Sequence, residues 1–286
     1  MKCAVFFQRF PRIRFSPRPA GSCGTAKTTL ARRGTWASGL LLFCGLFLIA
    51  AHVRAEEAPT QEKEKPKRRY TIRADHDPNG LGKFYLGREI AQVMGHQGIS
   101  WLERPEREQE EGLSLLVECL KLQPGMVVAD IGAGSGVISV RLARQIGPEG
   151  KVLAVDIQRE MLRALEIKCK GLGITNIQGV LGTSRSPNLD DQSVDLAIMV
   201  DVYHEFEFPY EMLLAISRSL KPGGRVAFVE YRKEDPTIPI KEVHKMTEAQ
   251  VKREAAEPGL NLKWVETLEK LPRQHVILFE KGEATR

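Results

Sequence analysis

The sequence predicts an α/β fold with a doubly wound, mostly parallel sheet that ends in an antiparallel C-terminal hairpin. Over about residues 105–281, short apolar runs alternate with longer segments of helical periodicity, as in parallel sheets covered on both faces. Proline–glycine breakers at 123–125 and 221–224 each precede an apolar run. The last two apolar runs are separated by only a short connection, which favours a hairpin.

Seven segments are expected to be strands, because each is short, apolar and bounded by turn residues. They are Val127–Asp130, Val152–Asp156, Ile177–Leu181, Val194–Val200, Arg225–Tyr231, Leu262–Glu269 and His275–Glu280. Five longer periodic segments are expected to be helices: Pro105–Leu122, Val137–Ile146, Gln158–Leu172, Pro209–Leu220 and Thr247–Ala256.

The first strand leads into a glycine-rich turn with the sequence Asp130-Ile131-Gly132-Ala133-Gly134-Ser135-Gly136. Glycine allows positive φ angles and a close approach of the backbone to a ligand. The helix that follows directs its free N–H groups toward the turn, which favours an anionic or nucleotide-like ligand. The alternative is a glycine turn that only packs a helix against the sheet.

The glycine spacing separates two cofactor classes. A dinucleotide site requires G-x-G-x-x-G, but here the third position of that pattern is Val137. The motif Asp130-x-Gly132-x-Gly134-x-Gly136 instead resembles the first motif of class I, Rossmann-like S-adenosylmethionine-dependent methyltransferases of the small-molecule type. In that family the acid lies near the amino-acid end of the cofactor.

A second strand ends in Asp156, twenty residues after Gly136, and resembles the second motif of the same family. A carboxylate at this position can accept hydrogen bonds from both ribose hydroxyls. The structural alternative is an acid that caps the helix starting at Gln158.

The resemblance covers roughly residues 105–281 and departs from the family at Thr183, where an acid near the adenine is usual. A hydroxyl there can still bond the adenine amine, though more weakly. The turn at residues 221–224 matches a structural turn of the family. The cofactor-binding residues that the resemblance implies are Asp130, Ile131, Gly132, Ala133, Gly134, Gly136, Asp156, Ile157, Thr183 and Asp201.

Candidate catalytic residues follow the fourth strand, because ligands of open α/β sheets bind beyond the carboxyl ends of the strands. Asp201, Tyr203 and His204 are expected beside the reactive methyl group. His204 is the candidate general base because its ordinary pKa is close to neutral. The Tyr203 ring could face the sulfonium. The alternative is that His204 and its neighbour Glu205 only precede or cap the next helix.

The N-terminal part is divided by composition. Residues 1–55 combine a basic segment, the apolar run 39–51 and a small-residue cleavage site at 53–55, which predicts a signal peptide or anchor. Residues 56–69 are a charged linker. Residues 70–104 are expected to form a lid over the cofactor, lined by His96 and Trp101, before a methyltransferase domain at 105–286. Trp101 packed only against the first helix is the alternative.

Charge argues against nucleic acid as a partner. The chain has a net charge of +6, but nine of its 42 Lys and Arg residues lie in residues 1–55, where there is no acid. The remaining 33 bases therefore face 36 acids. Such a mildly acidic domain lacks the basic surface that binds a phosphate backbone.

Metal and disulfide chemistry are not indicated by spacing. The six histidines show no zinc-binding spacing, and no metal ligand is predicted. Cys119 and Cys169, each in a predicted helix, are expected to be buried free thiols.

These observations together predict an exported, periplasmic or secreted, S-adenosylmethionine-dependent methyltransferase that acts on a small molecule. Membrane contact is expected only through the N-terminal segment, and the sequence indicates no oligomeric state. Two alternatives remain open: a sensor or scaffold that binds the cofactor without chemistry, and, less favoured by the glycine spacing, a nucleotide-dependent oxidoreductase.

Overall fold

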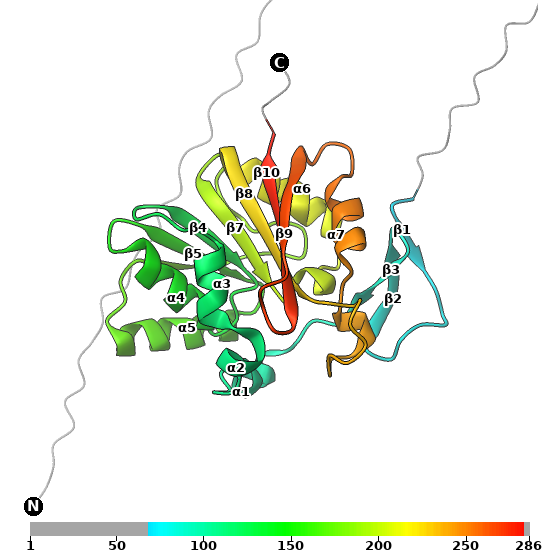
Figure 1. Cartoon of the computed structure of the whole chain (residues 1–286), viewed down its shortest axis with the longest axis horizontal. Coiled ribbons are helices and arrows are strands. Elements are labelled where there is room, and N and C mark those ends of the chain that lie inside the picture. The colour runs from blue at the N-terminus through cyan, green and yellow to red at the C-terminus, as the bar shows by residue number, and fades with distance from the viewer. Residues whose placement is uncertain (1–67, 283–286) are drawn as a thin grey trace, which may run out of the picture. The chain divides into compact units, whose positions relative to one another are not determined.

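The seven predicted strands form one sheet in the order β6-β5-β4-β7-β8-β10-β9 (Figure 1). Strands β6, β5, β4, β7 and β8 run parallel, and β10 pairs antiparallel with both β8 and β9. The mostly parallel fold with a C-terminal hairpin is thereby confirmed. The strands are β4 (Val127–Ile131), β5 (Lys151–Asp156), β6 (Ile177–Leu181), β7 (Val194–Val200), β8 (Leu220–Tyr231), β9 (Leu262–Leu268) and β10 (Gln274–Lys281).

The computed structural model describes residues 68–282. The predicted leader at 1–55 and most of the linker at 56–69 lie outside these residues. Among the described residues, none of the helices has the length and apolar character needed to span a bilayer. Cys119 and Cys169 are free and buried, as expected.

Alternate side chains of each central strand enter two different cores, which is why the strands read as continuous apolar runs. Ala129 and Ala197 face one core, which helices α6 (Pro209–Ser219) and α7 (Glu248–Ala255) cover. Val128 and Leu196 face the other, which α3 (Leu113–Cys119) and α4 (Val137–Ile146) cover (Figure 1). Helix α5 (Arg159–Leu172) packs on β5 and β6.

The predicted helix Pro105–Leu122 is in fact two helices, which corrects that expectation. Helix α2 (Arg107–Glu111) ends at Gly112, whose φ of 67° is left-handed, and α3 starts from the same residue. A Cβ at Gly112 would lie 3.1 Å from Pro272 Cδ. The glycine therefore permits both the change of direction and the close packing against the β9–β10 turn.

Residues 70–104 contain a second sheet that was not predicted. Strands β1 (Tyr70–Ile72), β2 (Gly80–Tyr85) and β3 (Arg88–Ala91) form an antiparallel meander. Its last hairpin turns at Leu86-Gly87, with φ angles of 47° and 92°. A glycine between two short alternating segments is the available sequence signal for such a turn.

The arrangement around β4 positions a cleft. Helix α4 follows β4 on one face of the sheet, whereas α6 follows β7 on the opposite face. Because β4 and β7 are parallel neighbours, the chain leaves their carboxyl ends in opposite directions, toward the two faces of the sheet. Such a topological switch point is where open α/β sheets bind ligands.

Candidate active site

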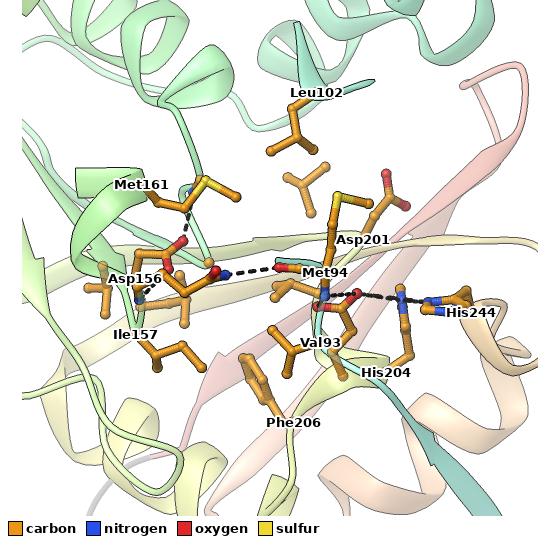
Figure 2. Close-up of a pocket in the computed structure, with 18 of the residues that line it drawn as sticks. Val93, Met94, Leu102, Asp156, Ile157, Met161, Asp201, His204, Phe206 and His244 are labelled. Atoms are coloured by element: carbon orange, nitrogen blue, oxygen red, sulfur yellow. Dashed lines mark hydrogen bonds and ion pairs between the residues drawn. The ribbon is translucent and has the colours of Figure 1, made fainter. Parts of the chain in front are cut away.

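A cavity of about 440 Å³ lies at the carboxyl ends of β4, β5 and β7 (Figure 2). Residues 93–102, the covering segment, close one side of the cavity, and the segment between β8 and α7 closes another. Residues that line the cavity include Met94, Trp101, Leu102, Ile131, Gly132, Gly134, Asp156, Ile157, Thr183, Asp201, His204, Glu205, Phe206, Ile240 and His244.

The glycine turn forms the floor of this cavity. Gly134 has a φ of 55°, and a Cβ there would lie 2.9 Å from Leu102 Cδ1 in the covering segment. Gly136 has a different role, because its Cβ would lie 2.1 Å from Leu165 Cδ1 on α5. Gly136 thus serves helix packing and does not line the cavity, and neither does Ala133.

Asp156 is held where a ribose acceptor is expected. One carboxylate oxygen accepts a hydrogen bond from Gly134 N (2.9 Å) and the other from Gln158 N (2.8 Å). A carboxylate oxygen can accept more than one hydrogen bond, so both oxygens can also accept from a ligand. Burial raises the pKa of Asp156 above its ordinary value, while the two N–H groups favour its charged form. Ile157 lines the cavity beside it.

Asp130 does not reach the cavity, contrary to the direct cofactor contact that the resemblance implies. Its carboxylate is buried inside β4 and accepts a hydrogen bond of 2.6 Å from Ser139 Oγ on α4. Burial raises the pKa of Asp130 to about 6. The position connects strand and helix beneath the turn, whereas the adjacent Ile131 does line the cavity.

Thr183 lines the cavity after β6, but its hydroxyl is already engaged. Thr183 Oγ1 accepts hydrogen bonds from the backbone N–H groups of Arg185 and Ser186, and it donates to Ser186 O. Its local role is to close the turn. A bond to an adenine amine would compete with these contacts.

Two of the three predicted catalytic side chains lie at the cavity and one does not. Asp201 has a left-handed φ of 50° at the end of β7. Its Oδ2 accepts from Gln274 Nε2, whereas its buried Oδ1 has no partner within residues 68–282. Burial raises the pKa of Asp201. An unpartnered carboxylate oxygen is an acceptor available to a cationic ligand.

Tyr203 points into the core, which corrects the expectation that its ring faces the sulfonium. Its hydroxyl donates to Glu254 (2.7 Å) on α7, and its ring packs edge-on against Phe206 and Phe228. Tyr203 is fully buried and does not line the cavity.

His204 lies at the cavity but is held by both ring nitrogens. Its Nδ1 shares a hydrogen bond of 2.6 Å with Glu230, and its Nε2 lies 3.1 Å from His244 Nδ1. Burial lowers the pKa of His204 to about 4. The near-neutral pKa that made His204 the expected base is therefore absent. Burial also lowers the pKa of His244 to about 4 and raises that of Glu205 to about 7.

Sequence reasoning missed Glu230 and His244. Glu230 is a fully buried acid within the apolar strand β8, and a lone acid in such a run is a usable signal for a functional or bridging group. His244 lies 40 residues beyond His204 in an irregular segment, where no periodicity indicates its position.

The covering segment is attached through Gln158, at the start of α5. Gln158 Nε2 donates to Met94 O (2.9 Å), and Gln158 Oε1 accepts from His96 N (2.8 Å). Met94 and Trp101 line the cavity, and the Arg104 guanidinium stacks on the Trp101 ring at 3.6 Å. The segment thus has the position of a lid, although the His96 side chain does not line the cavity.

The cleft lies at the switch point of a mostly parallel sheet, with an acid at the end of β5 and a glycine turn after β4. These features are typical of enzymes that bind a nucleotide-containing cofactor. A family model described as "Methyltransferase domain" matches residues 122–274, more than half of the chain. The chain belongs to this methyltransferase family, and the fold is that of class I S-adenosylmethionine-dependent methyltransferases. Membership implies S-adenosylmethionine as the cofactor.

Curated relatives match only part of the chain. The ubiquinone/menaquinone biosynthesis C-methyltransferase of Idiomarina loihiensis is 30% identical over 118 residues, covering 41% of this chain and 47% of that protein. The demethylmenaquinone methyltransferase of Lactobacillus johnsonii is 31% identical over 122 residues, covering 42% and 49%. The chain therefore spans about half the length of these relatives.

Solved structures extend the likeness of fold. A SAM-dependent methyltransferase from Aquifex aeolicus has a TM-score of 0.62 at 23% identity, covering 66% of this chain and all of that one. The [4+2]-cyclase SpnF has a TM-score of 0.51 at 13% identity, covering 59% and 79%. At these identities the likeness concerns the fold alone.

Proposed function

We propose that the protein transfers the methyl group of S-adenosylmethionine to a small molecule bound in the cavity. The observation that supports this most is the placement of Asp156 and Asp201 in one cavity, at the carboxyl ends of β5 and β7. The first suits ribose hydroxyls and the second suits a positively charged group. S-adenosylmethionine carries both.

The proposed orientation follows from these two acids. The ribose lies against Asp156 and Gly134, with the adenine toward Ile157 and Thr183. The cationic methionine end lies toward Oδ1 of Asp201, which has no partner among residues 68–282. The acceptor then occupies the side lined by His204, Phe206 and Ile240.

Proximity and alignment carry most of the proposed reaction. The acceptor's nucleophilic atom forms a bond to the methyl carbon as the bond from that carbon to sulfur breaks, and the electron pair passes to sulfur. Holding the two reactants in line makes the step effectively unimolecular. Met94 and Trp101 line this volume, and their closure over a bound cofactor would exclude water from it. One relative is named as a C-methyltransferase of ubiquinone and menaquinone biosynthesis and the other as a demethylmenaquinone methyltransferase, which agrees with a small acceptor.

Isothermal titration calorimetry and a transfer assay test the proposal together. S-adenosylmethionine should bind in a one-to-one ratio and raise the melting temperature, whereas NAD should do neither. Methyl-labelled cofactor, incubated with protein and a library of phenols, quinols and amines, should label an acceptor. Binding without any labelled product would support the sensor or scaffold alternative. Stabilisation by NAD alone would support the oxidoreductase.

We also propose that the protein acts outside the cytoplasm, on the strength of the basic and apolar pattern of residues 1–55. N-terminal sequencing of the mature protein should then begin at Glu56. A mature product that retains the apolar run but fractionates with membranes would indicate an anchor. A full-length product in the cytoplasm would contradict export.

A further inference from the structure

Three potential metal ligands meet at the wall of the cavity, although their spacing in the sequence does not indicate it. His204 Nε2 and His244 Nδ1, which Figure 2 shows side by side, are 3.1 Å apart. Glu205 Oε1 lies 3.9 Å from His204 Nε2 and 3.8 Å from His244 Nδ1. The three donor atoms thus form a small triangle, contributed by the 3-10 helix Tyr203–Glu205 and by the segment before α7.

This triangle fits the size of a metal site. Ligands bound at 2.0–2.2 Å to one ion are about 2.8–3.1 Å apart in octahedral geometry and about 3.3–3.6 Å apart in tetrahedral geometry. The two nitrogens, 3.1 Å apart, already have the octahedral separation. The carboxylate oxygen is up to about 1 Å too far from them, a shift that rotation about its side-chain bonds supplies.

The surroundings hold the ligands in place and supply negative charge. The Nδ1 of His204 is bonded to the Glu230 carboxylate, the arrangement that orients histidine ligands in metal proteins. Glu205 is buried. Among residues 68–282, its carboxylate accepts hydrogen bonds from one donor, Met94 N, which is shared between the two oxygens at 3.2 and 3.3 Å. A buried carboxylate with one neutral donor lacks full compensation, and a cation beside it would provide it.

We propose that His204, Glu205 and His244 bind one divalent first-row transition-metal ion at the wall of the cavity. Two imidazole nitrogens and one carboxylate favour Zn²⁺, Fe²⁺, Co²⁺ or Mn²⁺ over Mg²⁺ and Ca²⁺, because the last two ions prefer ligand sets made of oxygen alone. All three residues line the cavity, so the remaining coordination positions are reached from it.

These open positions indicate the acceptor class, an inference that rests on the proposed function. An acceptor with a phenol or enol oxygen would bind the ion through that oxygen. Coordination would lower the pKa of the hydroxyl, its proton would pass to solvent, and the resulting anion would be the nucleophile that takes the methyl group. The ion would thereby supply the activation expected of His204 as a base.

Metal binding is tested on chelator-treated full-length protein with Zn²⁺ and Co²⁺ as probes. Calorimetry should show one Zn²⁺ site, and Co²⁺ should give visible d–d absorption. His244→Ala and Glu205→Gln should each weaken Zn²⁺ binding by at least about tenfold, as loss of a ligand does more than loss of an outer partner. His96→Gln, a histidine at the lid but outside the triangle, should leave Zn²⁺ affinity unchanged.

Two further measurements separate this proposal from folding and from the proposed function. Circular dichroism melts of all variants identify any that fail to fold, and Glu205→Gln preserves both shape and an acceptor for Met94 N. S-adenosylmethionine titrations of the metal-free protein test cofactor binding on their own.

Adding catechol to the Co²⁺ protein should shift its absorption if open positions accept oxygen ligands. The metal site is overturned if the wild type binds neither ion stoichiometrically, or if both ligand variants bind as it does. The acceptor class is overturned if the Co²⁺ absorption is unchanged by catechol.

Discussion

At the scale of single residues, Asp156 is the most direct reporter of cofactor binding. Its two oxygens are fixed by Gly134 N and Gln158 N before any ligand arrives, so little reorganisation is needed. Asp156→Ala removes the ribose acceptor and should weaken S-adenosylmethionine binding by about 1–3 kcal/mol, measured by calorimetry. Asp190→Ala is the matched control, because Asp190 is exposed and does not line the cavity. Equal affinities of the two variants would refute this assignment.

Gly134 provides a second residue-scale prediction with an internal control. Gly134 and Gly125 both have positive φ angles, 55° and 82°, but a Cβ at Gly125 has nothing within 4 Å. Alanine at either position should cost about 1–2 kcal/mol of folding free energy through backbone strain. Only Gly134→Ala should also weaken cofactor binding, because its methyl group displaces Leu102. Denaturant melts and calorimetry separate the two effects, and unchanged affinity for Gly134→Ala would argue against the floor assignment.

At the scale of elements, a buried ion pair joins the N-terminal sheet to helix α7, and the same arginine also reaches the backbone of His204. Arg88 on β3 contacts Glu254 on α7 through two hydrogen bonds of 2.7 and 2.9 Å, and it donates to His204 O (3.1 Å). Arg88→Met leaves the Glu254 charge buried and should cost about 3–5 kcal/mol of stability. Arg141→Met removes a partly exposed pair with Glu108 and should cost less than about 1 kcal/mol. Denaturant titrations measure both, and comparable losses would refute this role for Arg88.

The lid is a second element whose attachment is testable. Gln158→Ala removes both side-chain bonds to the segment at Met94 and His96. Amide exchange in residues 94–102 should accelerate, because local opening becomes cheaper, while exchange in β4 should stay slow. Gln123→Ala, on the exposed turn before β4, is the control. Lid exchange that matches the wild type would show that other contacts hold the segment.

At the scale of the whole molecule, the sequence predicted the sheet well because parallel strands buried on both faces read as apolar runs. Strand β7, for example, was predicted with its observed bounds, Val194–Val200. The meander β1–β3 was missed because its strands are only three to six residues long and lack a sustained alternation of apolar and polar residues. The break at Gly112 was missed because helical periodicity continues across it. In the site, the position of Asp156 could be predicted because it follows directly from the order of a strand and the next helix. The environments of Asp130, Tyr203, His204 and His244 could not be predicted from the sequence, because they depend on burial and on contacts with residues distant in the chain.

The central claim is that the cavity at the carboxyl ends of β4, β5 and β7 binds S-adenosylmethionine in a defined orientation. A crystal structure of the protein with S-adenosylhomocysteine, the demethylated product, tests it most directly. The ribose hydroxyls should lie against the Asp156 carboxylate, and the sulfur should lie on the side of Asp201 and His204. A ligand bound outside this cavity, or with its ribose away from Asp156, would contradict this binding mode.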